Sequence, residues 1–263
     1  MSSTSRTAPP AVVNQNSTVL LIDEQIISDC SFSPSNGSKF VNSSLELFHR
    51  YTHHNMIELP VGGVLKRSMD ILISVAGLLL LAPTLVLVAL LIYLTMGRPI
   101  LFAHERVCFR GKSFKCYKFR TMVNGAGEKL AAYLHEHPPA AEEWRIHHKL
   151  KNDPRITPLG LVLRKASLDE LPQLINVLRG DMSCVGPRPV ARDELSRYQS
   201  SARYYMRVRP GVTGLWQISG RSRTTYAYRI ALDRAYVCNW SIWLDAKIII
   251  KTVPAVFRFH EVA

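Results

Sequence analysis

The chain has 263 residues, enough for one or two domains with a core of ordinary size. Its 33 Lys and Arg against 20 Asp and Glu give a formal net charge of +13, which implies an anionic partner: lipid headgroups, nucleotide phosphates or nucleic acid. The cysteines are scattered, odd in number and lack Cys-x-x-Cys spacing, so they predict reduced thiols facing the cytoplasm and exclude a disulfide scaffold: Cys30, Cys108, Cys116, Cys184 and Cys238.

The first sixty residues form a polar segment rich in Ser, Thr and Asn, without a sustained apolar period. This composition predicts a disordered tail over residues 1–60, although the apolar cluster from Val19 to Ile22 leaves an interaction strand as an alternative. No apolar core follows a basic start, so we do not expect a cleaved secretory signal.

An uncharged apolar run follows from Ile71 to Met96, with Lys66-Arg67 before it and Arg98 after it. About 20 apolar residues cross the roughly 30 Å hydrocarbon core, so the run is long enough to span a membrane. Basic residues gather on the cytoplasmic side, and here they flank both ends. Pro83 should kink the helix and split it into halves of about 18 Å, each too short to span alone. We therefore expect a re-entrant hairpin over residues 61–99; a straight span and a buried soluble helix are the alternatives.

The remainder, residues 100–263, is expected to be one cytoplasmic catalytic domain. Alternation from Phe114 to Arg120 after the Arg110-Gly111 turn predicts a short, half-buried β-hairpin. Helical patterns follow at Gly127 to Lys151, broken at Pro138-Pro139, at Leu171 to Leu178, at Val190 to Arg207, and as two helices in Tyr226 to Phe259. The aromatic and basic residues of the last segment suit helices at a membrane interface, with ordinary core packing as the alternative. The fold class is therefore α+β and mainly helical, with a re-entrant membrane helix hairpin, a β-hairpin and interfacial amphipathic helices.

Adjacent carboxylates in Ser167-Leu168-Asp169-Glu170 are the first candidate chemical group. As a local pattern this is a capping box, in which Ser167 and Glu170 satisfy each other's backbone amides. Asp169 is not needed for the cap, and Pro172 indicates a distorted helix entry. A carboxylate at a helix N-terminus close to Arg164 should stay ionised at neutral pH, able to act as a nucleophile or to hold a metal.

Two further motifs suit phosphate. In Val185-Gly186-Pro187-Arg188-Pro189, a proline on each side orients the guanidinium of Arg188 towards an oxyanion. The loop from Arg209 to Gly214, followed by Trp216, Gln217, Gly220 and Arg221, has glycines that allow backbone amides to approach an anion; a plain surface loop is the alternative. Basic and aromatic alternation at Phe114 to Arg120 could stack on nucleic acid, but no nucleic-acid-binding signature accompanies it, and we expect no nucleic acid partner.

Taken in series, these segments resemble the bacterial sugar transferase family, the small monotopic polyprenyl-phosphate phosphoglycosyl transferases. The resemblance covers about Gly63 to Val256 and rests on the anchor with Lys66-Arg67-x-x-Asp70, on FKCYKFRTM, SLDELPQLINVLRGDMSCVGPRP and RPGVTGLWQISGR, and on Leu232-Asp233 and Leu244-Asp245. Within the family the chain looks most like the galactosyl-phosphate transferases that initiate rhizobial exopolysaccharide.

The resemblance implies transfer of a sugar 1-phosphate, galactose 1-phosphate in that subgroup, from a UDP-sugar to undecaprenyl phosphate. UMP is released, and assembly of the exopolysaccharide repeat unit begins. Asp169 matches the family's nucleophile, which forms a covalent aspartyl phosphosugar intermediate, Glu170 matches its Mg²⁺-associated partner, and Asp233 matches a further required carboxylate. Arg164 and Arg188 match phosphate-contacting positions, and the full set expected to bind substrate is Lys118, Arg120, Arg164, Arg188, Arg209 and Arg221. Glucose or another UDP-sugar as donor, and a non-catalytic basic membrane adaptor, are the alternatives.

The resemblance also implies a place in the bacterial inner membrane, with the catalytic domain on the cytoplasmic face among membrane lipids. A homo-oligomer and contacts with other glycan-assembly enzymes are expected partners. Two departures from the family stand out. Ala82-Pro83 replaces a common Ser-Pro, and the segment from Gly127 to Lys151 is longer than in the smallest relatives.

Overall fold

The computed structural model describes residues 59–147, 149–219 and 225–256, so the polar tail expected over residues 1–60 lies almost entirely outside the described residues. The elements are α3 (Gly63–Met96), β1 (Leu101–Val107), η1 (Phe109–Gly111), β2 (Ser113–Phe119), α4 (Ala126–Glu136), α5 (Pro138–His147), α6 (Pro158–Lys165), η2 (Leu168–Glu170), α7 (Gln173–Arg179), β3 (Ser183–Val185), α8 (Arg192–Leu195), η3 (Ser196–Ser201), α9 (Ala202–Tyr205), β4 (Gly211–Thr213), α10 (Leu215–Ile218), α11 (Tyr226–Cys238) and α12 (Ile242–Val256). This is the mainly helical α+β fold that the sequence predicts.

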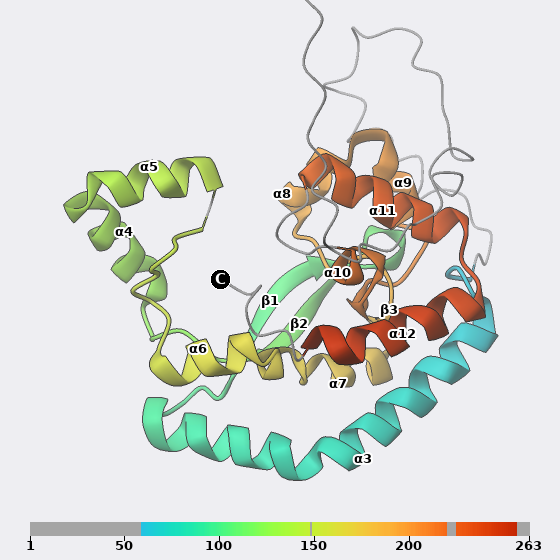
Figure 1. The fold of residues 1–263 in the computed structure, drawn as a ribbon, viewed down its shortest axis with the longest axis horizontal. Coiled ribbons are helices and arrows are strands. Elements are labelled where there is room, and N and C mark those ends of the chain that lie inside the picture. The colour runs from blue at the N-terminus through green and yellow to red at the C-terminus, as the bar shows by residue number, and fades with distance from the viewer. Residues whose placement is uncertain (1–58, 148, 220–224, 257–263) are drawn as a thin grey trace, which may run out of the picture.

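The strands form two small sheets. β1 and β2 pair antiparallel from Leu101 opposite Phe119 to Val107 opposite Ser113, which confirms the expected hairpin. β2 buries Phe114 and Cys116 and exposes Ser113 and Lys115, the period-2 pattern of a half-buried strand, and Phe119 at its end is buried as well, outside this period. β3 and β4 pair in parallel. The strands and helices α7, α10, α11 and α12 are drawn together around the core, whereas α4 and α5 stand apart from it (Figure 1).

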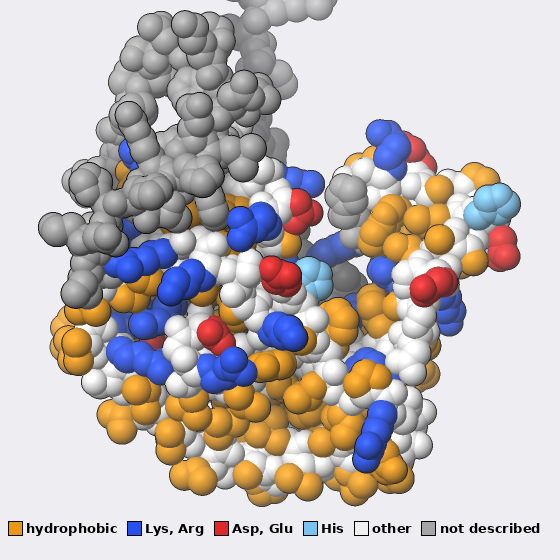
Figure 2. All heavy atoms as spheres, turned by 180° about the vertical axis from the view of Figure 1, so that it is seen from behind, with side chains coloured by type: hydrophobic (Ala, Val, Ile, Leu, Met, Phe, Trp, Pro, Cys, Tyr) orange, Lys and Arg blue, Asp and Glu red, His pale blue; other side chains and the backbone are white. Residues whose placement is uncertain are grey.

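Helix α3 is the one described helix that is long and apolar enough to cross a membrane. Leu72, Leu79 and Leu80 are 70%, 73% and 81% exposed, and hydrophobic side chains gather along the edge of the molecule that α3 forms (Figure 2). An apolar surface of this extent fits membrane association. The expected break at Pro83 is absent. The helix continues through this residue without interruption, and its axis bends (Figure 1), as a helix containing proline commonly does.

The N-terminal end of α3 is attached to the rest of the protein by buried polar side chains. Lys66, Asp70 and Ser74 lie one turn apart on one face and are 3%, 1% and 0% exposed. Lys66 Nζ lies 2.5 Å from Asp245 Oδ2 on α12, and Asp70 Oδ1 accepts hydrogen bonds from Ser183 Oγ and the Cys184 amide, both at 2.9 Å. We call Lys66, Arg67, Asp70 and Asp245 the anchor clamp.

Arg67 completes the anchor clamp by donating to the carbonyl oxygens of Val177 and Leu178, at 2.5 and 2.8 Å. A cation at these carbonyls satisfies groups that the end of α7 leaves unpaired. Lys66 and Arg67 were expected to mark the membrane flank as positive charges. The structure instead gives Lys66 a buried partner and Arg67 the C-terminus of α7, so neither side chain supports the flanking-charge argument for the hairpin.

Most of the other expected elements are confirmed. The segment from Gly127 to Lys151 forms α4 and α5, interrupted near Pro138, and the C-terminal segment forms α11 and α12. The expected helix from Val190 to Arg207 is instead three short pieces, because Gln199 has a φ of 46° and breaks the helical path. Cys108, Cys116 and Cys184 are buried free thiols.

Candidate active site

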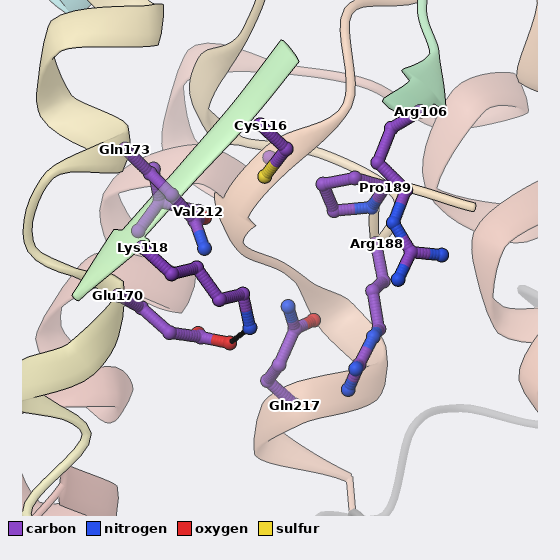
Figure 3. Close-up of a pocket in the computed structure, with 10 residues that line it drawn as sticks. Arg106, Cys116, Lys118, Glu170, Gln173, Arg188, Pro189, Val212 and Gln217 are labelled. Carbon is purple, nitrogen blue, oxygen red and sulfur yellow. Dashed lines mark hydrogen bonds and ion pairs between the residues drawn. The ribbon is translucent and has the colours of Figure 1, made fainter. Parts of the chain in front are cut away.

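A cleft opens where β2, η2, α7, α10 and the loop after β3 meet. Its lining combines a carboxylate, several cations and two amides: Arg106, Cys116, Lys118, Glu170, Gln173, Arg188, Pro189, Gly211, Val212 and Gln217. Figure 3 shows Glu170 and Lys118 on one side, with Arg106 and Arg188 across from them. Positive charge exceeds negative charge in this lining, so the cleft is suited to an anion.

Glu170 and Lys118 form an ion pair, with Lys118 Nζ 2.5 Å from Glu170 Oε1. Their side chains are 35% and 30% exposed, so both remain accessible from the cleft. Lys118 comes from β2 and Glu170 from η2, which brings two motifs 52 residues apart into direct contact.

Asp169 lies beside this pair in the same turn of η2 and is 8% exposed. Burial and the neighbouring charge of Glu170 raise the pKa of Asp169 to about 6, against the opposing effects of Lys118 and Arg164. The carboxylate therefore remains mainly ionised at neutral pH, as expected. Burial and Glu170 nevertheless destabilise its charge more than Lys118 and Arg164 stabilise it.

The expected capping box at Ser167 is not formed. Ser167 adopts a left-handed φ of 55°, its side chain caps no amide, and the chain continues as the 3-10 turn η2 before α7 begins at Gln173. A left-handed serine is uncommon, and here it turns the chain sharply at the carboxylate pair. The expected distorted entry at Pro172 is confirmed, because the residue precedes α7 rather than lying within it.

The two arginines expected to contact phosphate are both close to this turn or to the cleft. Arg164, in the last turn of α6, donates from Nε to Thr121 Oγ1 at 2.9 Å and acts electrostatically on Asp169. Arg188 lines the cleft, and its guanidinium lies over the Trp216 ring at 5.5 Å from the centroid. Stacking of this kind holds a guanidinium plane in place while leaving its edges available.

Asp233 lies behind the cleft and is not among its lining residues. It is 4% exposed and accepts a hydrogen bond from Tyr198 Oη at 2.7 Å. Burial raises its pKa to about 7, although the Tyr198 hydrogen bond and the nearby charge of Arg229 oppose the increase. Asp233 thus acts electrostatically on Arg229 and on the cleft-lining Arg188 without itself lining the cleft.

Two other expected substrate-binding arginines have structural partners instead. Arg120 is 5% exposed and donates to the carbonyl oxygens of Met96, Gly97 and Arg98, so it caps the C-terminal end of α3. Arg209 Nε donates to Gly180 O at 2.8 Å, just past the end of α7. Arg221 lies outside the described residues.

The glycine-rich loop packs closely against the segment that carries Arg188. A Cβ on Gly211 would lie 2.1 Å from Gly186 N, and one on Gly214 would lie 2.1 Å from Gly186 O. The glycines therefore allow two backbone segments of the protein to approach each other. Gly211 and Val212 also line the cleft, and an anion-binding role for this loop stays a prediction.

Arg106 and Gln173 also line the cleft, and sequence reasoning did not identify either. Arg106 belongs to β1, outside the motifs that carry the other candidates, while Gln173 is hidden inside the motif that carries Asp169. Only their spatial position identifies them.

A Mg²⁺ ion in the cleft would be held by Glu170, the carboxylate of its lining. Within the described residues no group of three or more His, Cys, Asp or Glu side chains gathers as a ready-made metal site. Mg²⁺ commonly takes one or two carboxylates and completes its shell with substrate phosphates and water. Glu170, which lines the cleft, fits such a shared site, in which it would exchange Lys118 for the ion.

Comparison with known proteins gives consistent results. The family model described as bacterial sugar transferase matches residues 61–259. An exopolysaccharide production protein, ExoY, of Rhizobium meliloti is 52% identical over 197 residues, covering 75% of this chain and 87% of that protein. An undecaprenyl-phosphate galactose phosphotransferase of Salmonella typhimurium is 49% identical over 199 residues, 74% of this chain and 40% of its own length. A UDP-glucose:undecaprenyl-phosphate glucose-1-phosphate transferase of Escherichia coli is 37% identical over 209 residues, 75% of this chain and 42% of its own length.

Proposed function

Because the chain belongs to the bacterial sugar transferase family, and is thus a sugar-phosphate transferase acting on a polyprenyl phosphate, we propose that it transfers galactose 1-phosphate from UDP-galactose to undecaprenyl phosphate. The reaction releases UMP and starts exopolysaccharide assembly. The observation that carries the proposal is the ionisable pair Asp169 and Glu170 beside a cleft lined by Lys118 and Arg188. Two relatives named for galactose transfer are 49% and 48% identical, against 37% and 40% for two named for glucose transfer, which favours galactose as the sugar, while a third relative named for galactose transfer is 36% identical.

In the proposed first step, Asp169 attacks the sugar-bearing phosphorus of UDP-galactose. The new bond joins this phosphorus to a carboxylate oxygen of Asp169, the bond from phosphorus to the bridging oxygen breaks, and UMP leaves with that oxygen. A carboxylate approaching a diphosphate meets like charge, so Lys118 and Arg188 would neutralise phosphate oxygens as the attack proceeds. Arg164 would help to keep the carboxylate of Asp169 ionised.

In the proposed second step, a phosphate oxygen of undecaprenyl phosphate attacks the same phosphorus and releases the carboxylate of Asp169. The covalent route divides one difficult transfer into two steps. Mg²⁺ held by Glu170 would supply further charge neutralisation at the diphosphate. The exposed apolar face of α3 supports membrane association, and the proposed location is the inner membrane with the cleft on the cytoplasmic side, where it would meet the lipid phosphate. The re-entrant hairpin at α3 stays a prediction, as does an interfacial position for α12, on which Trp243 and Ile250 are exposed.

The test is UMP release by purified protein with undecaprenyl phosphate, Mg²⁺ and a panel of UDP-sugars. We expect release with UDP-galactose. Asp169→Asn should lower turnover by about 1,000-fold or more, because the nucleophile is lost. The matched control is Asp181→Asn, a carboxylate past the end of α7 that does not line the cleft.

Intact-protein mass spectrometry without lipid acceptor would test the intermediate. The wild type should gain the mass of a hexose phosphate and Asp169→Asn should not. Release of UMP with UDP-glucose and with no other UDP-sugar would show that the donor is UDP-glucose and not UDP-galactose. Absence of release with every sugar, in folded protein, would favour the non-catalytic membrane adaptor.

A further inference from the structure

Two arginines that line the cleft are connected through shared neighbours to a third arginine outside the lining. Arg106 comes from β1, Arg188 from the loop after β3, and Arg229 from α11. Arg106 and Arg188 line the cavity directly. Arg229 is 9% exposed, and within the described residues its Nε and Nη2 atoms have no hydrogen-bond partner. Buried guanidinium nitrogens without partners are costly, so the charge of Arg229, next to the cleft lining, is only partly neutralised by hydrogen bonds.

The three arginines are joined by one carboxylate and one indole ring. Glu194 on α8 places Oε2 3.6 Å from Arg106 Nη1 and Oε1 3.3 Å from Arg229 Nη1. Trp216 lies beside two guanidinium groups, with Arg229 at 5.0 Å and Arg188 at 5.5 Å from its ring centroid. The three cations are therefore held in a fixed arrangement by neighbours that neutralise only part of their charge.

Glu194 is itself fixed by a third contact. Tyr226 Oη lies 3.3 Å from Glu194 Oε1, and the Arg229 guanidinium also lies over the Tyr226 ring at 5.4 Å. The separation of 3.6 Å between Arg106 and Glu194 is too long for a hydrogen bond, so the guanidinium is attracted to the carboxylate without using its donors on it. Within the described residues, no hydrogen bond to another group occupies those donors. They are available to a ligand in the cleft.

We propose that Arg106 is a further anion-contacting residue of the cleft and that Glu194 is the positioning residue that holds it there. The inference rests on the proposed function, since the anion would be the diphosphate of the nucleotide sugar. Arg106 donates hydrogen bonds to phosphate oxygens across from the Lys118–Glu170 pair. Glu194 keeps the guanidinium of Arg106 aligned with Arg188 and prevents it from turning out to solvent.

The test measures binding of UDP to purified protein by calorimetry, together with KM and kcat for the UDP-sugar. Arg106→Gln should weaken UDP binding about tenfold and raise KM, because a charge-assisted hydrogen bond is lost. Lys115→Gln is the matched control: it removes a cation from the same hairpin, but from an exposed position outside the cleft. Arg106→Lys, which keeps the charge without the planar fork, should fall between Arg106→Gln and wild type.

Glu194→Gln should weaken UDP binding by about threefold to tenfold, whereas Asp193→Asn, its neighbour on α8, should leave binding unchanged. The double variant with Arg106→Gln separates positioning from a merely structural role. If Glu194 acts through Arg106, adding Glu194→Gln to Arg106→Gln will have a smaller effect than it has in wild type. If the double variant weakens UDP binding by the full product of the two single-variant factors, Glu194 does not act through Arg106 and the positioning role is wrong.

Unchanged UDP binding in Arg106→Gln, with wild-type UMP release intact, would overturn the contact and leave the proposed function standing. Failure of the wild type both to bind UDP and to release UMP would overturn both.

Discussion

The anchor clamp and the cleft contain the same kinds of side chain and use them differently. In the anchor clamp, Lys66 and Asp245 are 3% and 0% exposed and face each other, and Asp245 also accepts from Tyr236 Oη and Trp240 Nε1 at 2.7 and 3.0 Å. In the cleft, Lys118 and Glu170 are about a third exposed, and Arg106 and Arg188 add positive charge without a matching carboxylate in the lining. Charges satisfied inside the protein stabilise the fold, whereas charges left partly unsatisfied at a cavity are available to a ligand.

Breaking the clamp should produce the largest effect on stability. Asp245→Asn leaves Lys66 buried without its charged partner, which costs about 3 to 5 kcal/mol. Urea unfolding of detergent-solubilised protein would measure the loss, and KM of the remaining folded protein should not change. Glu142→Gln, which breaks the exposed pair with Arg145, is the control and should leave the unfolding midpoint unchanged. An equal effect of both variants would contradict the distinction between clamp and surface charge.

Lys118 and Arg120 provide a sharper comparison, since they lie two residues apart. Arg120→Gln should lower the free energy of unfolding by about 1 to 3 kcal/mol, because carbonyls at the end of α3 lose their donors, while KM stays unchanged. Lys118→Gln should raise KM for the UDP-sugar about tenfold with little loss of stability. Chemical denaturation and steady-state kinetics on both variants would test this division. A raised KM in Arg120→Gln would show that Arg120 contributes to substrate binding after all.

The smallest of these effects near neutral pH should be the dependence of kcat/KM on pH. Asp169 must be ionised to attack, and its pKa of about 6 predicts that kcat/KM is halved near pH 6 and falls about tenfold per pH unit below it. Protonation of Asp169 should not destabilise the fold. A carboxyl whose pKa is raised in the folded state binds protons more tightly there than when unfolded, so protonation of Asp169 between pH 6 and 4 favours the folded state. A rate profile flat down to pH 5 would contradict the assignment of Asp169.

The sequence predicted the elements better than the partners of their charged side chains. Periodicity was sufficient for the β1–β2 hairpin, for α4 and α5, and for α11 and α12, because each depends on local pattern. Ser167 shows the limit of such patterns: the capping box requires a helix to start there, and the left-handed turn prevents it.

The partners of the arginines could not be predicted because they depend on distant segments. Arg120 and Arg188 both belong to basic motifs of the family, but the end of α3 occupies Arg120, whereas Arg188 lines the cleft. Arg106 and Glu194 lie 88 positions apart in the sequence, and no local motif predicts the ion pair between them. Motifs identify the family here, while tertiary packing decides which members of a motif reach the cleft.

The pairing of Lys66 with Asp245, 179 positions later, also has a consequence for biosynthesis. At about 5 to 20 residues per second, a ribosome needs roughly 10 to 35 s to reach Asp245 after making Lys66. The apolar helix emerges first and must wait, its polar face uncovered, until the final helix arrives. The anchor clamp between α3 and the rest of the protein is therefore completed among the last events in the folding of this enzyme. A nascent chain stalled before α12 would contain α3 without the Lys66–Asp245 contact that attaches it.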